Sequence, residues 1–469
     1  MCGPRPLRPG RGWPERGDGG RRWLPTLIER PLDVARSAGL MQDKAETGAG
    51  CPCGGVTVVR CRFPLSGILA CGLLFSACAD DGMAAGNLGQ AGAVGSGALD
   101  FSVFDAALQG AIDQHNASPE GQGKQVLGAS AVIVTRDGGV VHTQGYGQFA
   151  ADRAYLIASA SKILSVGVLM RLADQGLLDM HQPISTYLGA TWGEHKTTVT
   201  AAQLVSNSSG LPSLAELLGA GMNLNQETLL QYGAHFCQYM PAGFLSDCGA
   251  GIYADDQPMN NRPPDLEFRY GGSQWQLAGA LAEVVSGKSW ADLIRETYVE
   301  PCDAPTLGFT NPFGASGESG SSGIGYPSFF QGDSNNAPMT ANPSIEGGAY
   351  ITGPDYGKLL LMHLREGVCG DTRVLSAEAV REMQTDRVAA YGGAVTTGQG
   401  PSPFSGYGLG WWIGDGYVAD PGAYGAYPFI DPARGYAAMI LIEVESAVGG
   451  KLAAAVRPTL EAIIDGASM

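Results

Sequence analysis

Ser159 and Lys162 are the pair of residues whose types and spacing most clearly suggest catalysis. A serine hydroxyl is a weak nucleophile until a neighbouring base accepts its proton, and a lysine amine can be that base when burial lowers its pKa. Residues three apart share one face of a helix, whose N-terminus favours negative charge. The pair therefore predicts covalent catalysis through an acyl-serine. The alternative is a serine helix cap followed by a solvated lysine.

The elements that must position this pair follow from hydrophobic periodicity. Apolar residues recur at helical spacing over 159–178, which predicts a helix with Ser159 at its start. Upstream, β-rich segments at 126–135 and 140–146 flank residues 137–139, whose Asp-Gly-Gly sequence is typical of a tight hairpin turn. A hairpin is therefore expected just before the catalytic helix.

Helical segments dominate the middle of the chain, from about residue 184 to 387, and strands return after residue 407. Further helices are expected at the two ends, over 101–115 and 452–464. Because strands occur near both ends, they must share one antiparallel sheet, with the terminal helices on one face. The sequence therefore predicts an α/β fold of the α+β kind, with a mostly helical insertion at about 184–387.

Several segments around these residues resemble the serine β-lactamase-related family, which contains class C β-lactamases, DD-peptidases and esterases. In chain order, the segments are 153–162, 172–179, 183–188, 203–212, 268–272, 285–288, 347–349 and 407–411. The resemblance covers about residues 101–465 and implies a β-lactamase/transpeptidase-like fold. It also implies that Ser159 is the acyl-forming nucleophile and that Lys162 is its proton partner.

The family's second motif, Tyr-x-Asn, is matched here only by its tyrosine. The resemblance implies that Tyr270 relays a proton to the leaving group together with Lys162. Gly272 stands where the family has the asparagine that orients the lysine and the substrate. The substrate-binding side of this motif is therefore altered.

The third motif of the family, Lys-Thr-Gly or His-x-Gly, has its best candidate at residues 422–426. Ala423 then stands where the family has a cation, and Tyr424 follows it. Gly425 would allow a substrate backbone to approach closely. The backbone N–H groups of Ser159 and Ala426 would form the oxyanion hole, which depends on backbone geometry rather than on side chains.

These departures bear on the substrate. The family's asparagine and cation help to bind the carboxylate and amide of a penicillin or a D-Ala-D-Ala peptide, and the net charge of −16 further opposes anionic ligands, nucleic acid included. We therefore expect a serine hydrolase acting on a small ester, amide or peptide, with no cofactor and no metal. The alternatives are a β-lactamase or DD-carboxypeptidase, and a catalytically degraded binding protein of the cell envelope.

The N-terminal part of the chain has the pattern of a secretory signal. Arg60 and Arg62 precede an apolar stretch at 63–74, and small residues then lead to Cys78. This arrangement resembles the lipobox of bacterial lipoproteins, in which the cysteine is acylated and becomes the new N-terminus. Residues 58–77 are thus expected to be a lipoprotein signal peptide; an ordinary signal peptide cleaved nearby is the alternative.

The expected organisation follows from this signal. Residues 1–57 are predicted to be a non-structural upstream segment, and the Gly/Ala/Ser-rich residues 78–100 a flexible tether. Residues 101–469 are expected to form the catalytic domain. Lipid on Cys78 would hold the protein at a membrane of the bacterial cell envelope, facing the periplasm.

Four cysteines remain after the expected lipid anchor: Cys237, Cys248, Cys302 and Cys369. An oxidising compartment permits two disulfides among them. Cys237–Cys248 closes a short loop and is the first pairing expected, which leaves Cys302–Cys369 as the second. Four buried free thiols are the alternative.

Overall fold

The computed structural model describes residues 99–189, 192, 196–213, 245–254, 262–309, 343–389 and 404–467. All of them belong to one unit, Gln90–Met469. The expected signal peptide, Cys78, nearly all of the tether and Cys237 lie outside the described residues, so these predictions stand as predictions. Among the described residues, no helix is both long enough and apolar enough to cross a membrane.

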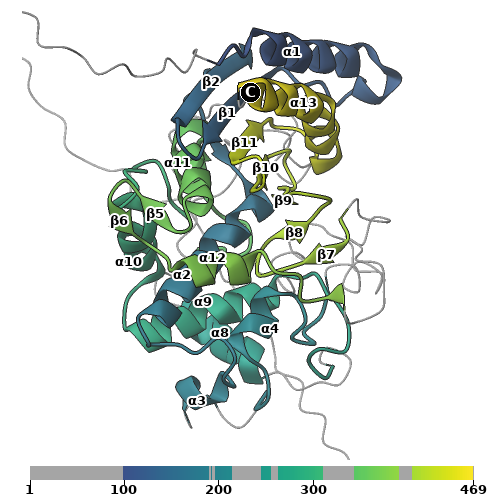
Figure 1. Ribbon diagram of the computed structural model, residues 1–469. Helices are drawn as coiled ribbons and strands as arrows, with labels where there is room; N and C mark the ends of the chain where they lie inside the picture. The colour runs from purple at the N-terminus through teal and green to yellow at the C-terminus, as the bar shows by residue number, and fades with distance from the viewer. Residues whose placement is uncertain are drawn as a thin grey trace, which may run out of the picture. The chain divides into compact units, whose positions relative to one another are not determined.

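A seven-stranded antiparallel sheet forms the upper part of the unit, in the order β2-β1-β11-β10-β9-β8-β7 (Figure 1). Its strands are β1 (Gly128–Thr135), β2 (Gly139–Gly147), β7 (Gly406–Tyr407), β8 (Trp412–Ile413), β9 (Val418–Ala419), β10 (Tyr427–Asp431) and β11 (Tyr436–Leu441). β1 pairs with β11 over six residues, with Ile133 opposite Ala438. Strands from both ends of the chain therefore share one sheet, as predicted.

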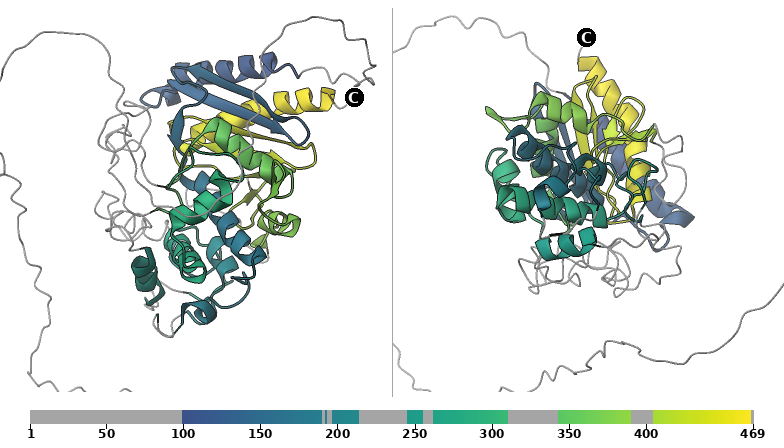
Figure 2. Two further views of the ribbon diagram at one scale, coloured as in Figure 1. Left: turned by 90° about the vertical axis from the view of Figure 1, so that its left-hand side faces the viewer. Right: turned by 90° about the horizontal axis from the view of Figure 1, so that it is seen from below.

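The two faces of this sheet are covered by different helices (Figure 2). The terminal helices α1 (Ser102–Ala117) and α13 (Ser446–Ala467) lie on one face, and α11 (Gly353–Leu364) lies on the other. Side chains alternate along a strand, so Ile133 of β1 packs in the cluster with the terminal helices while Val132 packs in the cluster with α11. This alternation explains why almost all of β1 is buried.

Helices make up most of the lower part of the unit. They are α2 (Lys162–Asp174), α3 (Ser185–Leu188), α4 (Ala201–Val205), α8 (Leu245–Ala254), α9 (Ser273–Ser286), α10 (Trp290–Ile294) and α12 (Ala377–Met383). Three single turns and two small sheets complete the described elements. The turns are the 3-10 turns η1 (Pro119–Gly121) and η2 (Ala158–Ser161) and the π turn η4 (Arg295–Val299). One small sheet pairs β3 (Ala154–Leu156) with β4 (Tyr350–Thr352), and the other pairs β5 (Val368–Cys369) with β6 (Thr372–Arg373). The range expected as a helical insertion is thus not helical throughout, because β4 pairs with β3 and α11 packs on the main sheet.

The helix that follows Ser159 lies at the centre of the unit. The sequence predicts one helix over 159–178; the structure instead has the 3-10 turn η2 and then α2, after which Gly176 adopts a φ of 71°. Nearly every residue of α2 is buried, from Lys162 to Leu172. A helix buried on all sides is held rigidly by its neighbours, which suits a helix that positions catalytic groups.

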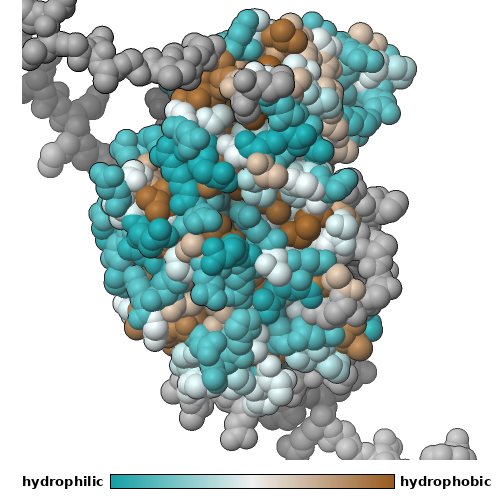
Figure 3. Space-filling view, viewed as in Figure 1, coloured by the Kyte–Doolittle hydropathy of each residue, from teal (hydrophilic) through white to brown (hydrophobic). Residues whose placement is uncertain are grey.

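A disulfide joins Cys302 to Cys369, two of the four cysteines that were expected to form disulfides, across 67 residues of sequence. Cys248 is also disulfide-bonded. The Cys302–Cys369 pairing is the second of the two pairings predicted. On the face drawn in Figure 3, the described residues are mostly hydrophilic, and the apolar ones occur in separate spots.

His363 of α11 is a buried histidine with a consequence for acid stability. Its side chain is 3% exposed, neither ring nitrogen has a hydrogen-bond partner, and its ring meets that of Trp411 edge to face at 5.4 Å. Burial lowers the pKa of His363 to about 4. An unfolded histidine titrates near about 6.5, so the unfolded chain binds a proton first as the pH falls. Stability is therefore lost between about pH 6.5 and about pH 4, by at most about 3 kcal/mol.

We accordingly expect His363→Leu to lose less thermal stability than the wild type between about pH 7 and about pH 4.5, because it has no imidazole to charge. Thermal unfolding followed by circular dichroism at both pH values measures the difference. His115→Gln, which removes a histidine that contacts the Lys124 carbonyl outside the core, is measured beside it as the comparison variant. Equal acid losses in His363→Leu and the wild type would contradict the assignment.

Candidate active site

The turn before α2 presents Ser159. Residues 154–156 pair with β4, and the Ile157 N–H then donates to the Ala349 carbonyl at 3.0 Å. Ala158 adopts a φ of 48°, in the left-handed region that costs a residue with a Cβ about 1 kcal/mol. This sharp turn leaves Ser159 half-buried while its neighbours on both sides are buried. Backbone strain next to a half-exposed serine is typical of a nucleophile held in place.

Lys162 lies within hydrogen-bond distance of Ser159, as the spacing predicts. Its Nζ donates to the Ser159 Oγ at 3.1 Å and to the main-chain carbonyl of Glu346 at 2.9 Å. The side chain is only 1% exposed. Ser161, between the two, is structural: its Oγ accepts a hydrogen bond from the Ala349 N–H at 3.0 Å. The segment around Glu346 therefore fixes both the nucleophile turn and the lysine.

The charges around Lys162 act against the expected effect of burial. Burial by itself lowers the pKa of Lys162, but Tyr270, Glu346 and Asp420 together outweigh it and raise that pKa above its usual value. The sequence-based expectation of a lowered pKa is therefore wrong for the free protein, because it counted burial and not these partners.

Tyr270 is the second group beside the nucleophile. The Lys162 Nζ lies 4.9 Å from the centre of its ring, and hydrogen bonds from Ser159 and Lys162 favour its phenolate. Burial raises the pKa of Tyr270 and the Lys162 charge lowers it, with a net rise. The ring packs on Trp412 and Phe268 at 5.4 and 6.2 Å between centres. Tyr270 and Lys162 thus form one coupled pair. When this pair has lost one proton, one of its two groups can act as a base.

Gly272 caps the N-terminus of α9, two residues after Tyr270. A Cβ at this position would lie only 2.3 Å from Oε2 and 2.4 Å from Oε1 of Glu346. The carboxylate of Glu346 therefore occupies the space that a side chain at position 272 would need. Sequence reasoning missed Glu346; its only signal is a charged residue directly before the Gly347-Gly348 pair.

The segment assigned to the third motif forms the loop between β9 and β10. The backbone of Gly422 packs against the Ile157 carbonyl, so the loop lies beside the nucleophile turn. Ala423 is exposed, Tyr424 is half-buried, and the buried Ala426 accepts a hydrogen bond from the Gly422 N–H at 2.8 Å.

Gly425 has a backbone conformation and a packing contact that both favour glycine. Its φ is 90°, and a Cβ there would lie 2.3 Å from the Ile442 side chain. This packing against the core favours glycine here by itself, and the expected approach of a substrate backbone to Gly425 stays a prediction. The oxyanion role of Ser159 and Ala426 stays a prediction.

Asp420 is a second residue that sequence reasoning missed. It follows β9, is completely buried, and its Oδ2 accepts a hydrogen bond of 3.4 Å from the Ile163 N–H at the start of α2. Burial raises the pKa of Asp420 well above its usual value, against the opposing effect of Lys162. This carboxyl group therefore helps to hold the first residues of α2, the helix that follows Ser159. The sequence offers no signal beyond one acid after a short apolar run.

Comparison with known proteins places this site in a family. The model of the family described as Beta-lactamase matches residues 108–457. Penicillin-binding protein 4 of Amycolatopsis lactamdurans is 26% identical over 338 residues, which cover 67% of this chain and 79% of that protein. Esterase/beta-lactamase LipL of Mycobacterium tuberculosis is 28% identical over 197 residues, or 40% of each chain.

Solved structures show the same fold. A putative beta-lactamase from Bacteroides dorei superposes with a TM-score of 0.54 at 22% identity, over 78% of this chain and 99% of that one. EstCE1, a hydrolase with promiscuous acyltransferase activity, superposes with a TM-score of 0.56 at 17% identity, over 75% and 98%. At these identities the likeness concerns the fold alone.

Proposed function

The chain belongs to the Beta-lactamase family, and on that premise we propose that it is a serine hydrolase which forms an acyl-enzyme on Ser159. The observation that carries the proposal is the 3.1 Å hydrogen bond between the Lys162 Nζ and the Ser159 Oγ. A buried lysine in hydrogen-bond contact with a half-exposed serine supports an activated nucleophile. A degraded binding protein would have no reason to keep this pair, its strained turn and Tyr270 together.

In acylation, the Ser159 Oγ attacks the carbonyl carbon of the substrate and its proton passes to the Lys162–Tyr270 pair. The pair accepts it in the form that lacks one proton, whether that form is ammonium with phenolate or amine with phenol. The backbone N–H groups of Ser159 and Ala426 stabilise the oxyanion. Collapse of the intermediate breaks the bond to the leaving group, which takes the proton from Tyr270.

In deacylation, water attacks the acyl-serine, the pair accepts a proton from that water, and the Ser159 oxygen leaves and is reprotonated. The pair thus ends in its starting form. Since acid adds a second proton to the pair and removes its base, activity falls on the acid side of the profile.

The proposed substrates are small esters, amides or peptides that lack a carboxylate. Gly272 and Ala423 provide no amide or cation for a carboxylate, and the Glu346 carboxylate repels one. A β-lactamase or DD-carboxypeptidase is the second candidate, which the match to penicillin-binding protein 4 over 79% of its length favours.

A substrate panel separates the two. We expect the purified protein to hydrolyse short uncharged chromogenic esters with a kcat/KM at least about a hundred times that for a chromogenic cephalosporin or a D-Ala-D-Ala peptide. A higher kcat/KM for either anionic substrate would favour the second candidate. Hydrolysis of none of them by folded protein would contradict both.

We also propose that the protein is exported and held at the cell envelope by lipid on Cys78, because basic, apolar and small residues precede this cysteine in order. Cell fractionation tests this. The wild type should partition with membranes and Cys78→Ser should not; equal partitioning of both would contradict the lipid anchor.

Tyr270→Phe tests the relay to the leaving group. We expect kcat to fall about a hundredfold for an ethyl ester, whose alkoxide needs a proton, and much less for a p-nitrophenyl ester, whose leaving group does not. Steady-state kinetics with both esters measures the difference. Tyr187→Phe removes a phenol oxygen that binds the Asp179 N–H in another part of the chain, and should change neither rate. Equal losses with the two esters would place Tyr270 outside the leaving-group step.

A further inference from the structure

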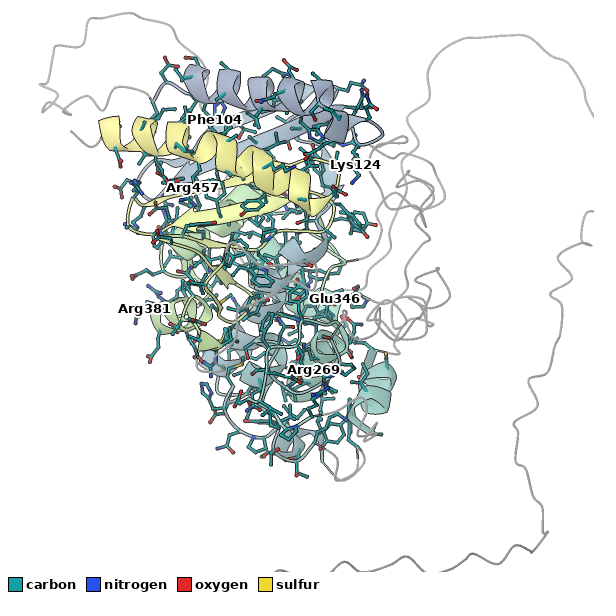
Figure 4. All side chains as sticks on the ribbon, turned by 90° about the vertical axis from the view of Figure 1, so that its right-hand side faces the viewer. Phe104, Lys124, Arg269, Glu346, Arg381 and Arg457 are labelled. Atoms are coloured by element: carbon teal, nitrogen blue, oxygen red, sulfur yellow. A yellow bond between two sulfur atoms is a disulfide. The ribbon has the colours of Figure 1, made fainter. Side chains whose placement is uncertain are left out.

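Glu346 lies on the solvent-facing side of the site rather than beneath it. Ser159, Tyr270, Gly272 and Glu346 are all half-exposed, whereas Lys162, which touches this set from below, is buried. Figure 4 shows Glu346 at mid-height in the unit, between the sheet above and the helices below. A substrate that reaches Ser159 therefore approaches the edge on which the Glu346 carboxylate is placed.

The carboxylate is held at this edge by two features. The main-chain carbonyl of Glu346 accepts the 2.9 Å hydrogen bond from Lys162, so the backbone at this residue is tied to the catalytic lysine. The side chain then extends over Gly272, with both carboxylate oxygens within 2.4 Å of where a Cβ would be. The absence of a side chain at position 272 and the presence of an acid at position 346 thus fit each other.

A carboxylate at this place has a defined preference. It only accepts hydrogen bonds, so it favours a donor that carries positive charge and repels a carboxylate. In a half-exposed site such a charge-assisted contact discriminates by about tenfold. The most common donor of this kind on a small ester or amide is a protonated amine.

We propose that Glu346 makes this enzyme selective for substrates that carry a protonated amine close to the scissile bond, such as aminoacyl esters and amides. The proposal rests on the proposed function and deepens it by assigning the substrate class. Glu346 binds the substrate and takes no part in proton transfer to Ser159.

Matched esters test this selectivity. One series has acyl chains of equal length that end in an ammonium or a methyl group; a second series carries the same pair of ends on the alcohol. The full chain should hydrolyse the ammonium member of at least one series about ten times better in kcat/KM, and Glu346→Gln should bring that ratio close to one. Comparing two substrates on one enzyme cancels any general effect of the substitution on the chemistry.

Two further variants sharpen the result. Gly272→Ala displaces the Glu346 carboxylate without removing its charge. The ratio of kcat/KM for the ammonium ester to that for the methyl ester should therefore fall in this variant too. If only the charge mattered, and not its position, the ratio would stay at the wild-type value. Glu378→Gln, on the exposed first turn of α12, removes the same charge elsewhere and should keep the wild-type ratio.

The outcomes separate the two proposals. A ratio that is the same in the wild type and Glu346→Gln, in both series, would overturn the role of Glu346 while leaving a serine hydrolase. Wild-type protein that hydrolyses no ester of either series and forms no covalent adduct at Ser159 would overturn the proposed function itself.

Discussion

Ser159→Ala reduces ester hydrolysis to the uncatalysed background while the protein stays folded. Without the hydroxyl no acyl-enzyme forms, and loss of a catalytic serine typically costs several orders of magnitude, about 10⁴-fold or more. The substitution removes one half-exposed oxygen, so the free energy of unfolding changes little. Release of the chromophore from a neutral ester measures the loss, and circular dichroism checks the fold.

Ser161→Ala is the matched control, two residues away. Its hydroxyl is buried and bonds the Ala158 carbonyl and the Ala349 N–H, so its removal costs stability, about 1–3 kcal/mol. It should retain hydrolysis at a temperature where it is folded. If Ser161→Ala were inactive and Ser159→Ala active, the nucleophile would be misassigned.

Lys162→Met has the second largest expected effect, a fall in kcat of about a thousandfold. The unbranched methionine fills most of the same buried space but can neither exchange a proton with Ser159 nor carry charge. Loss of the lysine also removes its lowering effect on the pKa of Tyr270, so less of this tyrosine is in the phenolate form that can accept the serine proton. Burial already raises the pKa of Asp420, so its carboxyl group can stay neutral without the lysine and the fold should survive.

Single-turnover kinetics on a neutral ester measures this loss in the acylation step. Lys288→Met supplies the control, because that lysine is exposed and forms only a surface ion pair with Glu296. A folded Lys162→Met protein that acylates at the wild-type rate would show that another group accepts the serine proton.

The fold was largely predictable because its long elements have a clear period. The helix expected over 101–115 is α1 within two residues, and the strand predicted at 126–135 is β1 within two residues. The short strands β7, β8 and β9, of two residues each, carry no detectable alternation. Their pairing comes from tertiary contacts that a local pattern does not contain.

The site was predictable only where it is local in sequence. Ser159 and Lys162 are three residues apart, so helix geometry alone brings them together. Glu346 is 184 residues from Lys162, and Asp420 is 257 residues from Ile163, so only the fold reveals these contacts. The same distant groups reverse the expected pKa shift of Lys162, because burial alone does not determine which charged residues from distant parts of the chain lie beside the lysine.

Intact-mass analysis after treatment with a fluorophosphonate tests the central claim most directly. The reagent adds covalently to activated serines, and peptide mapping then locates the adduct. The account predicts one adduct, on the peptide that contains Ser159, and none on Ser159→Ala. An adduct that persists in that variant, or no adduct on folded wild-type protein, would contradict an activated nucleophile at Ser159.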